Sequence, residues 1–515
     1  MTETVTTAAG RYSQLAADRQ QYLTRARDCA KYTIPTLVPP EGHGPSTRYH
    51  TPYQSLGAEG VNNLSSKLLL ALLPINTPFF RLQINDFTLD LIDQSPGARG
   101  EFEKGVSRYE RAVMTHLETN RVRTSVHEAL KYLIVSGNVL IYFSPEGGLR
   151  VFRLDRYVVH RDPMGNVLEI LTRETISPDV LPEKLRKASV GESASKSPQK
   201  TLDLYTHVTR KEDQWEVYQE VSGQVVPGSE GSYPLDKLPW IPLRWTKIDG
   251  ESYGRGYVEE YLGDLRTLEG LTKAIVIGSS AAAKVLFFVN PNGTTKISVI
   301  SKAESGDVVP GNSEDVSTLQ VEKRADFATA YETIQMVANR LARAFLLNSA
   351  VQRDAERVTA EEVRYVAQEL EDALGGVYSI LSQELQLPLV NTLIHDMETK
   401  KILPPLPKEI VKPIITTGLE ALGRGHDLQK IIMMKNIIVE LGPEIAMKYL
   451  NFGEYFKRTG ASLGIDMDGL IKTEEEVQQI DQQLAVQQLI ETLGPNAMKI
   501  LQDQLKPEAQ QNNGS

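Results

Sequence analysis

Two long helical patterns near the middle of the chain constrain its fold more than any other feature. The first covers residues 255–283, where apolar residues such as Leu265 and Leu268 fall on one side of a helix. The second covers 324–347, where apolar residues recur at spacings of three and four. Residues 284–323 between them contain Pro-Asn-Gly and Pro-Gly-Asn turns, which are typical of β structure. We therefore expect two helices side by side, with a β-rich insert at their far end.

This helix pair has too few partners within the chain to bury both of its flanks. An apolar helix face is stable in water only when another surface covers it. A neighbouring copy of the chain can supply that surface, and the same contact repeated around an axis closes into a ring. A helical hairpin packed on its own domain is the alternative interpretation.

The segments before this pair are mixed, so the sequence predicts the α+β class. The periodicity predicts four helices, at 11–32, 54–73, 102–117 and 125–136. Between residues 138 and 248 the apolar period changes to two and the turns are short, which indicates antiparallel strands.

The segments after the pair are predicted to be mainly helical. A capping box at Thr359 and Glu362 opens a long helix that reaches residue 398. Gly375, Gly376 and Pro388 are expected to bend it. Glycine and proline punctuate the helical part that follows, and 505–515 is predicted to be a disordered end.

Composition excludes several classes of protein. With 515 residues the chain is too long for a single core. Its net charge of −10 argues against a protein that grips nucleic acid over its whole surface, although it permits nucleic acid to pass. The single cysteine, Cys29, excludes an internal disulfide framework and fits a reducing compartment. No secretory signal and no apolar run near the ~18 residues of a membrane span are found, so no membrane partner is expected.

One short motif raises the question of catalysis. Residues 250–254 fit Gly-x-Ser-x-Gly between a strand and a helix, as a hydrolase nucleophile at Ser252 would require, and His395 or His426 would follow in the right order. A hydrolase also needs several βα units around this point, whereas long helices and one antiparallel insert follow instead. We therefore expect a glycine-flanked turn without catalysis, and keep a serine hydrolase as the alternative.

Motifs for cofactors are missing from the sequence. It has no Gly-x-x-x-x-Gly-Lys phosphate loop. Its eight histidines include no pair at metal-ligand spacing. Gly254 and Gly256 lack the third glycine of a dinucleotide site. The sequence predicts no cofactor and no metal.

The loop at 348–358 is charged and contains neither glycine nor proline, although it joins two helices. Its polar side chains include Gln352, Arg353, Glu356 and Arg357. The simplest interpretation is a solvated loop whose arginines pair locally with acidic neighbours. These arginines are nevertheless the remaining candidates for a functional contact.

Four long strings resemble a known family: "TPYQSLGAEGVNNLSSKLLLALLP", "DGESYGRGYVEEYLGDLRTLE", "AERVTAEEVRYVAQELEDALGGVYSILSQELQLPLV" and "PIITTGLEALGRG". Over residues 11–425, in order and with few gaps, the chain is similar to the head-to-tail connector, or portal, proteins of short-tailed bacteriophages of the autographivirus type. The resemblance implies a portal fold, mainly helical with a β-containing wing and clip, in a ring that usually has twelve copies.

The resemblance also implies how the chain is divided. The expected parts, in order, are a wing (1–254), stem helix 1 (255–283), the clip (284–323), stem helix 2 (324–347), a tunnel loop (348–358), a long wing helix (359–402), a crown (403–504) and the disordered tail (505–515). The tunnel loop would turn Gln352, Arg353, Glu356 and Arg357 toward DNA. The clip would dock partners through Lys284, Lys296 and Lys302. Gly250, Ser252 and Gly254 would form a hinge between wing and stem.

The partners implied by the resemblance are those of a DNA conduit at one capsid vertex. Double-stranded DNA would pass without being read for sequence. The terminase large subunit would dock during packaging and the tail adaptor and tail tube proteins afterwards. Capsid, scaffolding and internal core proteins would complete the set, in a virion component assembled in the host cytoplasm. A non-portal scaffold that oligomerises through the same helices is a further alternative.

Overall fold

The computed structural model describes residues 7–44, 46–74, 78–84, 98–183, 185, 201–282, 286–319, 324–347, 369–370, 372–374, 376–406, 411–415 and 436. The chain divides into two units, Met1–Gly418 and Leu419–Ser515. Only residue 436 of the second unit is described. Most of the predicted crown and the whole predicted tail therefore lie outside the described residues.

The four helices predicted for the N-terminal part are present, within a few residues of the expected bounds. They are α1 (Ala8–Lys31), α2 (Leu56–Leu72), α4 (Ala98–Thr119) and α5 (Val122–Ser136). α5 ends at Gly137, whose φ of 72° places it in the left-handed conformation that glycine adopts at helix C-termini. The N–H of Gly137 donates to the Leu133 carbonyl, so the helix stop is the one that the sequence predicted.

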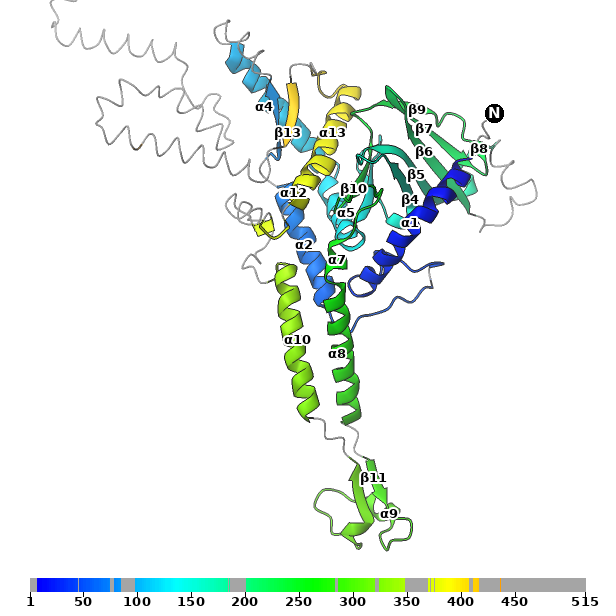
Figure 1. Cartoon of the computed structure of the whole chain (residues 1–515), viewed down its shortest axis with the longest axis vertical. Helices are drawn as coiled ribbons and strands as arrows, with labels where there is room; N and C mark the ends of the chain where they lie inside the picture. The colour runs from blue at the N-terminus through cyan, green and yellow to red at the C-terminus, as the bar shows by residue number, and fades with distance from the viewer. Residues whose placement is uncertain are drawn as a thin grey trace, which may run out of the picture. The chain divides into compact units, whose positions relative to one another are not determined.

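A six-stranded antiparallel sheet forms one side of the wing (Figure 1). Its strands are β4 (Tyr157–Arg161), β5 (Val167–Ile176), β6 (Leu202–Arg210), β7 (Gln214–Val221), β8 (Gln224–Val225) and β9 (Gly231–Pro234), which pairs with β7. α1 packs on one face of this sheet, where its Tyr12 and Leu15 are buried with Val158 and Leu171. These residues form a small apolar cluster that is separate from the main core.

Two smaller sheets join distant parts of the first unit. β10 (Trp240–Arg244), β2 (Asn138–Phe143) and β3 (Leu149–Phe152) form an antiparallel sheet in that order. β1 (Phe80–Ile84) pairs with β13 (Val411–Ile415), which ties the start of the chain to its later part.

The predicted stem and clip are two helices with a hairpin between them. The first helical stretch consists of α7 (Tyr257–Glu260) and α8 (Leu262–Ala282), so the helix expected from residue 255 begins later and is interrupted at Tyr261. The second is α10 (Arg324–Ala344). Within its described residues, 286–319, the insert has two strands, β11 (Leu286–Val289) and β12 (Val316–Leu319), together with α9 (Ile297–Ile300) and the 3₁₀ turn η4 (Ser313–Asp315).

The described part of the long wing helix is irregular. α12 (Gly376–Leu381) continues through a π-helical turn, η6 (Ser382–Gln386), into α13 (Leu387–Thr399). Pro388 has no N–H to donate to a carbonyl in the preceding turn, so the irregular turn lies where the sequence predicts a bend. None of the helices within the described ranges is long and apolar enough to cross a membrane.

Candidate functional site

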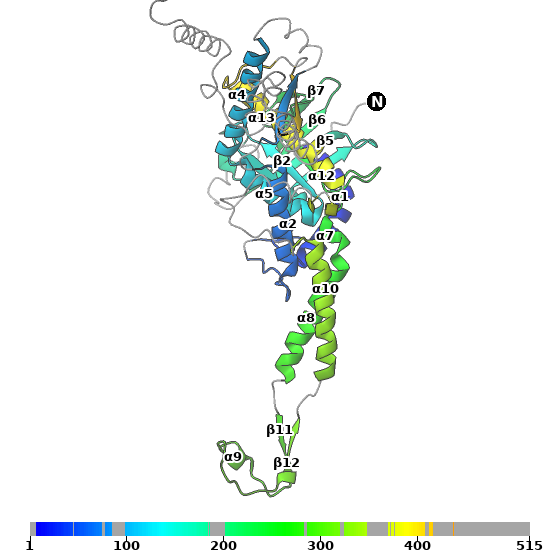
Figure 2. The same cartoon turned by 90° about the vertical axis from the view of Figure 1, so that its left-hand side faces the viewer.

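The predicted stem comprises α8 and α10, which lie side by side (Figures 1 and 2). Near the wing their facing side chains are buried: Leu265, Leu268, Val337 and Leu341. Arg340 Nη2 donates to Asp264 Oδ1 at 2.7 Å on the outside of this seam. The helical periodicity at these positions thus predicted the contact between the two helices.

The two helices expose large apolar side chains that no other described part of the chain covers. On α8, Val276 is 46% exposed and Ile277 is 52% exposed. On α10, Tyr331 is 59% exposed and Met336 is 63% exposed. Single exposed apolar residues are common on soluble proteins, but four of them along one helix pair make this pair a candidate surface for contact with another protein.

The turn that leads from the wing into the stem is held by hydrogen bonds on both sides. Gly254 N–H donates to Asn138 Oδ1 at 2.8 Å, and Asn138 Nδ2 donates to the Gly254 carbonyl at 2.7 Å. A Cβ on Gly254 would lie 2.6 Å from the Thr246 carbonyl oxygen, so only glycine fits. Gly250 adopts a φ of 74°, a value that glycine reaches without strain. These contacts hold the turn in one conformation. The structure does not test movement at this turn, so the hinge at Gly250, Ser252 and Gly254 stays a prediction.

Ser252 lies in this turn, and its hydroxyl accepts a hydrogen bond from the backbone. Its Oγ accepts a hydrogen bond from the Arg161 N–H at 3.3 Å. The neighbouring Tyr253 is buried, and its hydroxyl accepts from the Val159 N–H at 3.0 Å. His395 of α13 is one of the two candidate bases, and its Nδ1 lies 3.2 Å from Lys237 Nζ. The other candidate, His426, lies outside the described residues, and among those described Ser252 forms no hydrogen bond to a histidine.

The predicted stem meets the predicted wing at α2. Phe345 belongs to the apolar pattern of 324–347, but the sequence did not single out its partners on α2. Phe345 packs on Gly60, where an added Cβ would lie 2.5 Å from the phenyl Cγ. Asn63 Nδ2 donates to the carbonyl oxygens of Phe345 and Leu346, at 2.9 Å each. Tyr257 Oη donates to the Ala344 carbonyl at 2.8 Å, and burial raises the pKa of Tyr257. Three carbonyls at the end of α10 therefore find donors outside their own helix.

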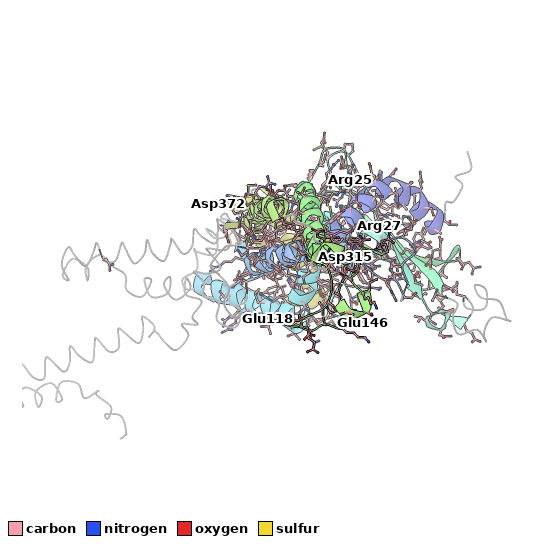
Figure 3. The ribbon with its side chains drawn as sticks, turned by 90° about the horizontal axis from the view of Figure 1, so that it is seen from below. Arg25, Arg27, Glu118, Glu146, Asp315 and Asp372 are labelled. Carbon is pink, nitrogen blue, oxygen red and sulfur yellow. The ribbon has the colours of Figure 1, made fainter. Side chains whose placement is uncertain are left out.

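The clip is organised around one carboxylate. Asp315, labelled in Figure 3, accepts hydrogen bonds from Thr295 N–H at 3.1 Å and from Thr295 Oγ1 at 3.0 Å. Thr294 Oγ1 donates at 3.3 Å to Asp315 Oδ2, the carboxylate oxygen that also accepts both hydrogen bonds from Thr295. The hydrogen bond from Thr295 is the main reason why the pKa of Asp315 is lowered. The carboxylate thus fastens the turn after β11 to the start of β12.

The residues predicted to dock partners or DNA are only partly described. Lys296 and Lys302 of the clip are exposed, while Lys284 lies outside the described residues. The whole segment 348–358, with Gln352, Arg353, Glu356 and Arg357, also lies outside them. Within the described part of the chain, no group of three or more His, Cys, Asp or Glu side chains could hold a metal ion.

The chain belongs to the family of bacteriophage head to tail connecting proteins, whose family model matches residues 5–471. Its fold combines helices and antiparallel sheets, which confirms the α+β prediction. Members of the family are structural connectors without an enzymatic role, so the hydrolase alternative for Ser252 is discarded.

Three curated relatives support the family assignment. The portal protein of Escherichia phage T7 is 48% identical over 475 residues, which cover 91% of this chain and 88% of that protein. The portal protein of Enterobacteria phage T3 is 46% identical, with coverages of 94% and 91%. The portal protein of Pseudomonas phage phiKMV is 32% identical, with coverages of 88% and 90%. The resemblance to the autographivirus type is thereby confirmed.

A solved structure that matches the chain is much more distant. A chain from the neck of an empty gene transfer agent particle aligns with a TM-score of 0.37 and 10% identity, over 73% of this chain and 86% of that chain. This similarity is too low to assign a role to any residue.

Proposed function

We propose that twelve copies of this chain form a ring at one capsid vertex, through which double-stranded DNA is packaged and later ejected. The observation that carries the proposal is the exposed apolar surface of the stem, at Val276, Ile277, Tyr331 and Met336. An isolated chain would leave this surface in water, whereas neighbouring stems in a ring bury it. The T7 and T3 relatives named portal proteins support the same function.

A pair of matched substitutions tests the ring. Ile277 on the stem is 52% exposed, and Val180 in the short 3₁₀ turn Pro178–Val180 of the wing is 75% exposed. Replacing either with Asp changes an exposed side chain and should alter the stability of one chain by less than about 0.5 kcal/mol. Ile277→Asp should prevent or weaken assembly, measured as particle mass by light scattering, while Val180→Asp should not. Assembly unchanged in Ile277→Asp would contradict the proposed role of the stem.

The electrostatics of such a ring suit a conduit. Twelve copies at −10 each carry about −120, so most of the surface repels phosphates. Against this background, one Arg353 and one Arg357 per copy would form a narrow positive collar that contacts phosphates without reading bases. Weak, sequence-independent contact lets DNA move, whereas tight binding would stall it. This role for 348–358 is a proposal that the residue types and the family support.

The clip is proposed to dock the terminase large subunit and then the tail adaptor and tail tube proteins. Two kinds of exposed groups on it are suited to docking: the lysines Lys296 and Lys302, and the apolar tip at Val308, which is 99% exposed. Replacement of 284–323 by a short Gly/Ser linker should spare wing folding and abolish attachment of terminase and tail. Packaged, tailed particles from that variant would place docking elsewhere.

The other proposed parts follow from the family. The wing (1–254 with 359–402) and the crown (403–504) would contact capsid, scaffolding and internal core proteins in a virion component that assembles in the host cytoplasm. Immunogold labelling of virions with an antibody to the crown segment tests the location. Label at a single vertex supports it, and label spread over the shell contradicts it.

A further inference from the structure

The end of α10 has a backbone conformation that needs outside support. Leu347 N–H donates to the Ala342 carbonyl at 2.8 Å and Leu346 N–H donates to the Arg343 carbonyl at 3.1 Å. These two bonds define the helix end in which one residue adopts the left-handed conformation, a position that glycine usually occupies. Here it is Leu346, with a φ of 54°. A side chain with a Cβ is strained at such a φ, so the surrounding structure must hold it.

Two polar residues of α2 provide that support. Asn63 donates to the carbonyl oxygens of Phe345 and Leu346, and Lys67 Nζ donates to the Leu346 carbonyl at 2.9 Å. Asn63 and Lys67 are four residues apart and therefore lie on the same face of α2. The strained residue is thus fixed from one helix face.

Lys67 makes a second contact, with a residue that follows the predicted tunnel loop in the sequence. Its Nζ lies 2.9 Å from Glu369 Oε2, and the side chains of Lys67 and Glu369 are only 8% and 21% exposed. One ammonium group therefore binds both the Leu346 carbonyl and the Glu369 carboxylate. Lys67 therefore contacts the chain just before segment 347–368, at Leu346, and again just after it, at Glu369.

We propose that Lys67, assisted by Asn63, is a positioning site that anchors both ends of segment 347–368 to α2. The functional part of this inference rests on the proposed DNA conduit, since the segment contains Arg353 and Arg357. A buried ion pair that loses one partner leaves the other charge without compensation, so loss of Lys67 releases both ends together.

Trypsin cleavage after Arg353 and Arg357 in the folded full-length chain tests the anchor directly. Cleavage of a folded protein follows the population of locally opened molecules when opening is fast. Lys67→Met keeps the apolar stem of the side chain but removes the charge, and should accelerate cleavage at these two sites about tenfold. Lys67→Arg keeps a charged donor and should stay close to wild type. The rates are read site by site by mass spectrometry.

Lys237→Met is the matched control. Lys237 is 11% exposed and pairs with Glu398 at 3.2 Å, so it is a similar buried lysine in a different part of the chain. It should lower thermal stability to a similar extent and leave cleavage after Arg353 and Arg357 unchanged. Glu369→Gln removes only the ion pair, so its cleavage rate should lie between those of wild type and Lys67→Met. Wild-type rates in Lys67→Met, or equal acceleration in Lys237→Met, would overturn the anchor.

Particles carrying Lys67→Met separate this inference from the proposed function. DNA protected from nuclease should fall severalfold relative to wild type and Lys237→Met particles, while ring mass stays constant. Wild-type particles that protect DNA no better than empty shells would refute the conduit and leave the cleavage result standing. Equal protection in wild type and Lys67→Met would refute a role of the anchor in DNA retention.

Discussion

The carboxylate of Glu169 is expected to make the attachment of α1 depend on pH. Arg11 Nη2 donates to Glu169 Oε2 at 2.7 Å, and His207 Nε2 lies 2.7 Å from Glu169 Oε1. Burial alone would raise the pKa of Glu169, but the hydrogen bonds from His207 and Arg11 outweigh it and lower the pKa to about 2. The side chain is only 10% exposed, so solvent screens these contacts little.

The sign and the size of the effect follow from this lowered pKa. The ordinary pKa of a glutamate is 4.5, so ionised Glu169 stabilises the folded chain above about pH 4.5 and loses this contribution as the pH falls toward 2. A difference of this size is worth about 3 kcal/mol at pH 7 and about half of that at pH 3. Glu169→Gln removes the charge and should lower the free energy of unfolding by about 3 kcal/mol at pH 7. The gap between the variant and wild type should then narrow as the pH falls.

Urea denaturation at pH 7, 5, 4 and 3, followed by tryptophan fluorescence at fixed protein concentration, measures that gap. Trp215 of β7 is buried in the same six-stranded sheet as Glu169 of β5, so its fluorescence reports the unfolding of this sheet. Glu216→Gln is the control. Glu216 is 52% exposed and its Oε2 lies 3.8 Å from Lys211 Nζ, and such an exposed, long ion pair contributes little to stability. A gap between Glu169→Gln and wild type that is the same at pH 7 and pH 3 would refute the reasoning.

Three further predictions concern the joint, the clip and the loop. Ser252→Ala should lower the free energy of unfolding by about 1 kcal/mol or less, for one lost hydrogen bond, and should leave assembly unchanged. The wild-type protein should not be labelled by a fluorophosphonate probe; stoichiometric labelling would show a nucleophilic serine. Asp315→Asn should increase hydrogen exchange in 290–315 but not in α8, and the exposed Glu314→Gln should change neither; unaltered exchange would show that the carboxylate does not hold the clip. Arg353→Ala/Arg357→Ala should leave assembly and thermal stability intact but reduce the DNA content of particles and flatten its salt dependence; full particles at every salt concentration would place the loop away from DNA.

The elements that the sequence predicted well are those with strong local signals. Gly137 ends α5 because glycine alone reaches that φ without strain. The strands of the six-stranded sheet follow the period-two pattern, and short turns join β4 to β5 and β6 to β7. Pro388 marks the irregular turn of the long wing helix, since a residue without an N–H changes the hydrogen bonding around it.

The contacts that sequence reasoning missed join residues far apart in the chain. Lys67 interrupts an apolar helix face, and periodicity alone cannot show that its charge meets Leu346 and Glu369. Its one visible signal is a lysine at a position that the helical pattern assigns to the core. In the same way, nothing local in the sequence shows that Arg11 and His207 meet at Glu169. The interruption at Tyr261 was missed because the apolar pattern continues through it.

We propose that this chain works as a closed ring around a DNA channel. Single-particle images of the purified wild-type protein, combined with its native mass, test the ring itself. We expect rings with an axial opening and a mass close to twelve times 57.3 kDa. A stable monomer near 57.3 kDa, or an open filament without an axial opening, would contradict it.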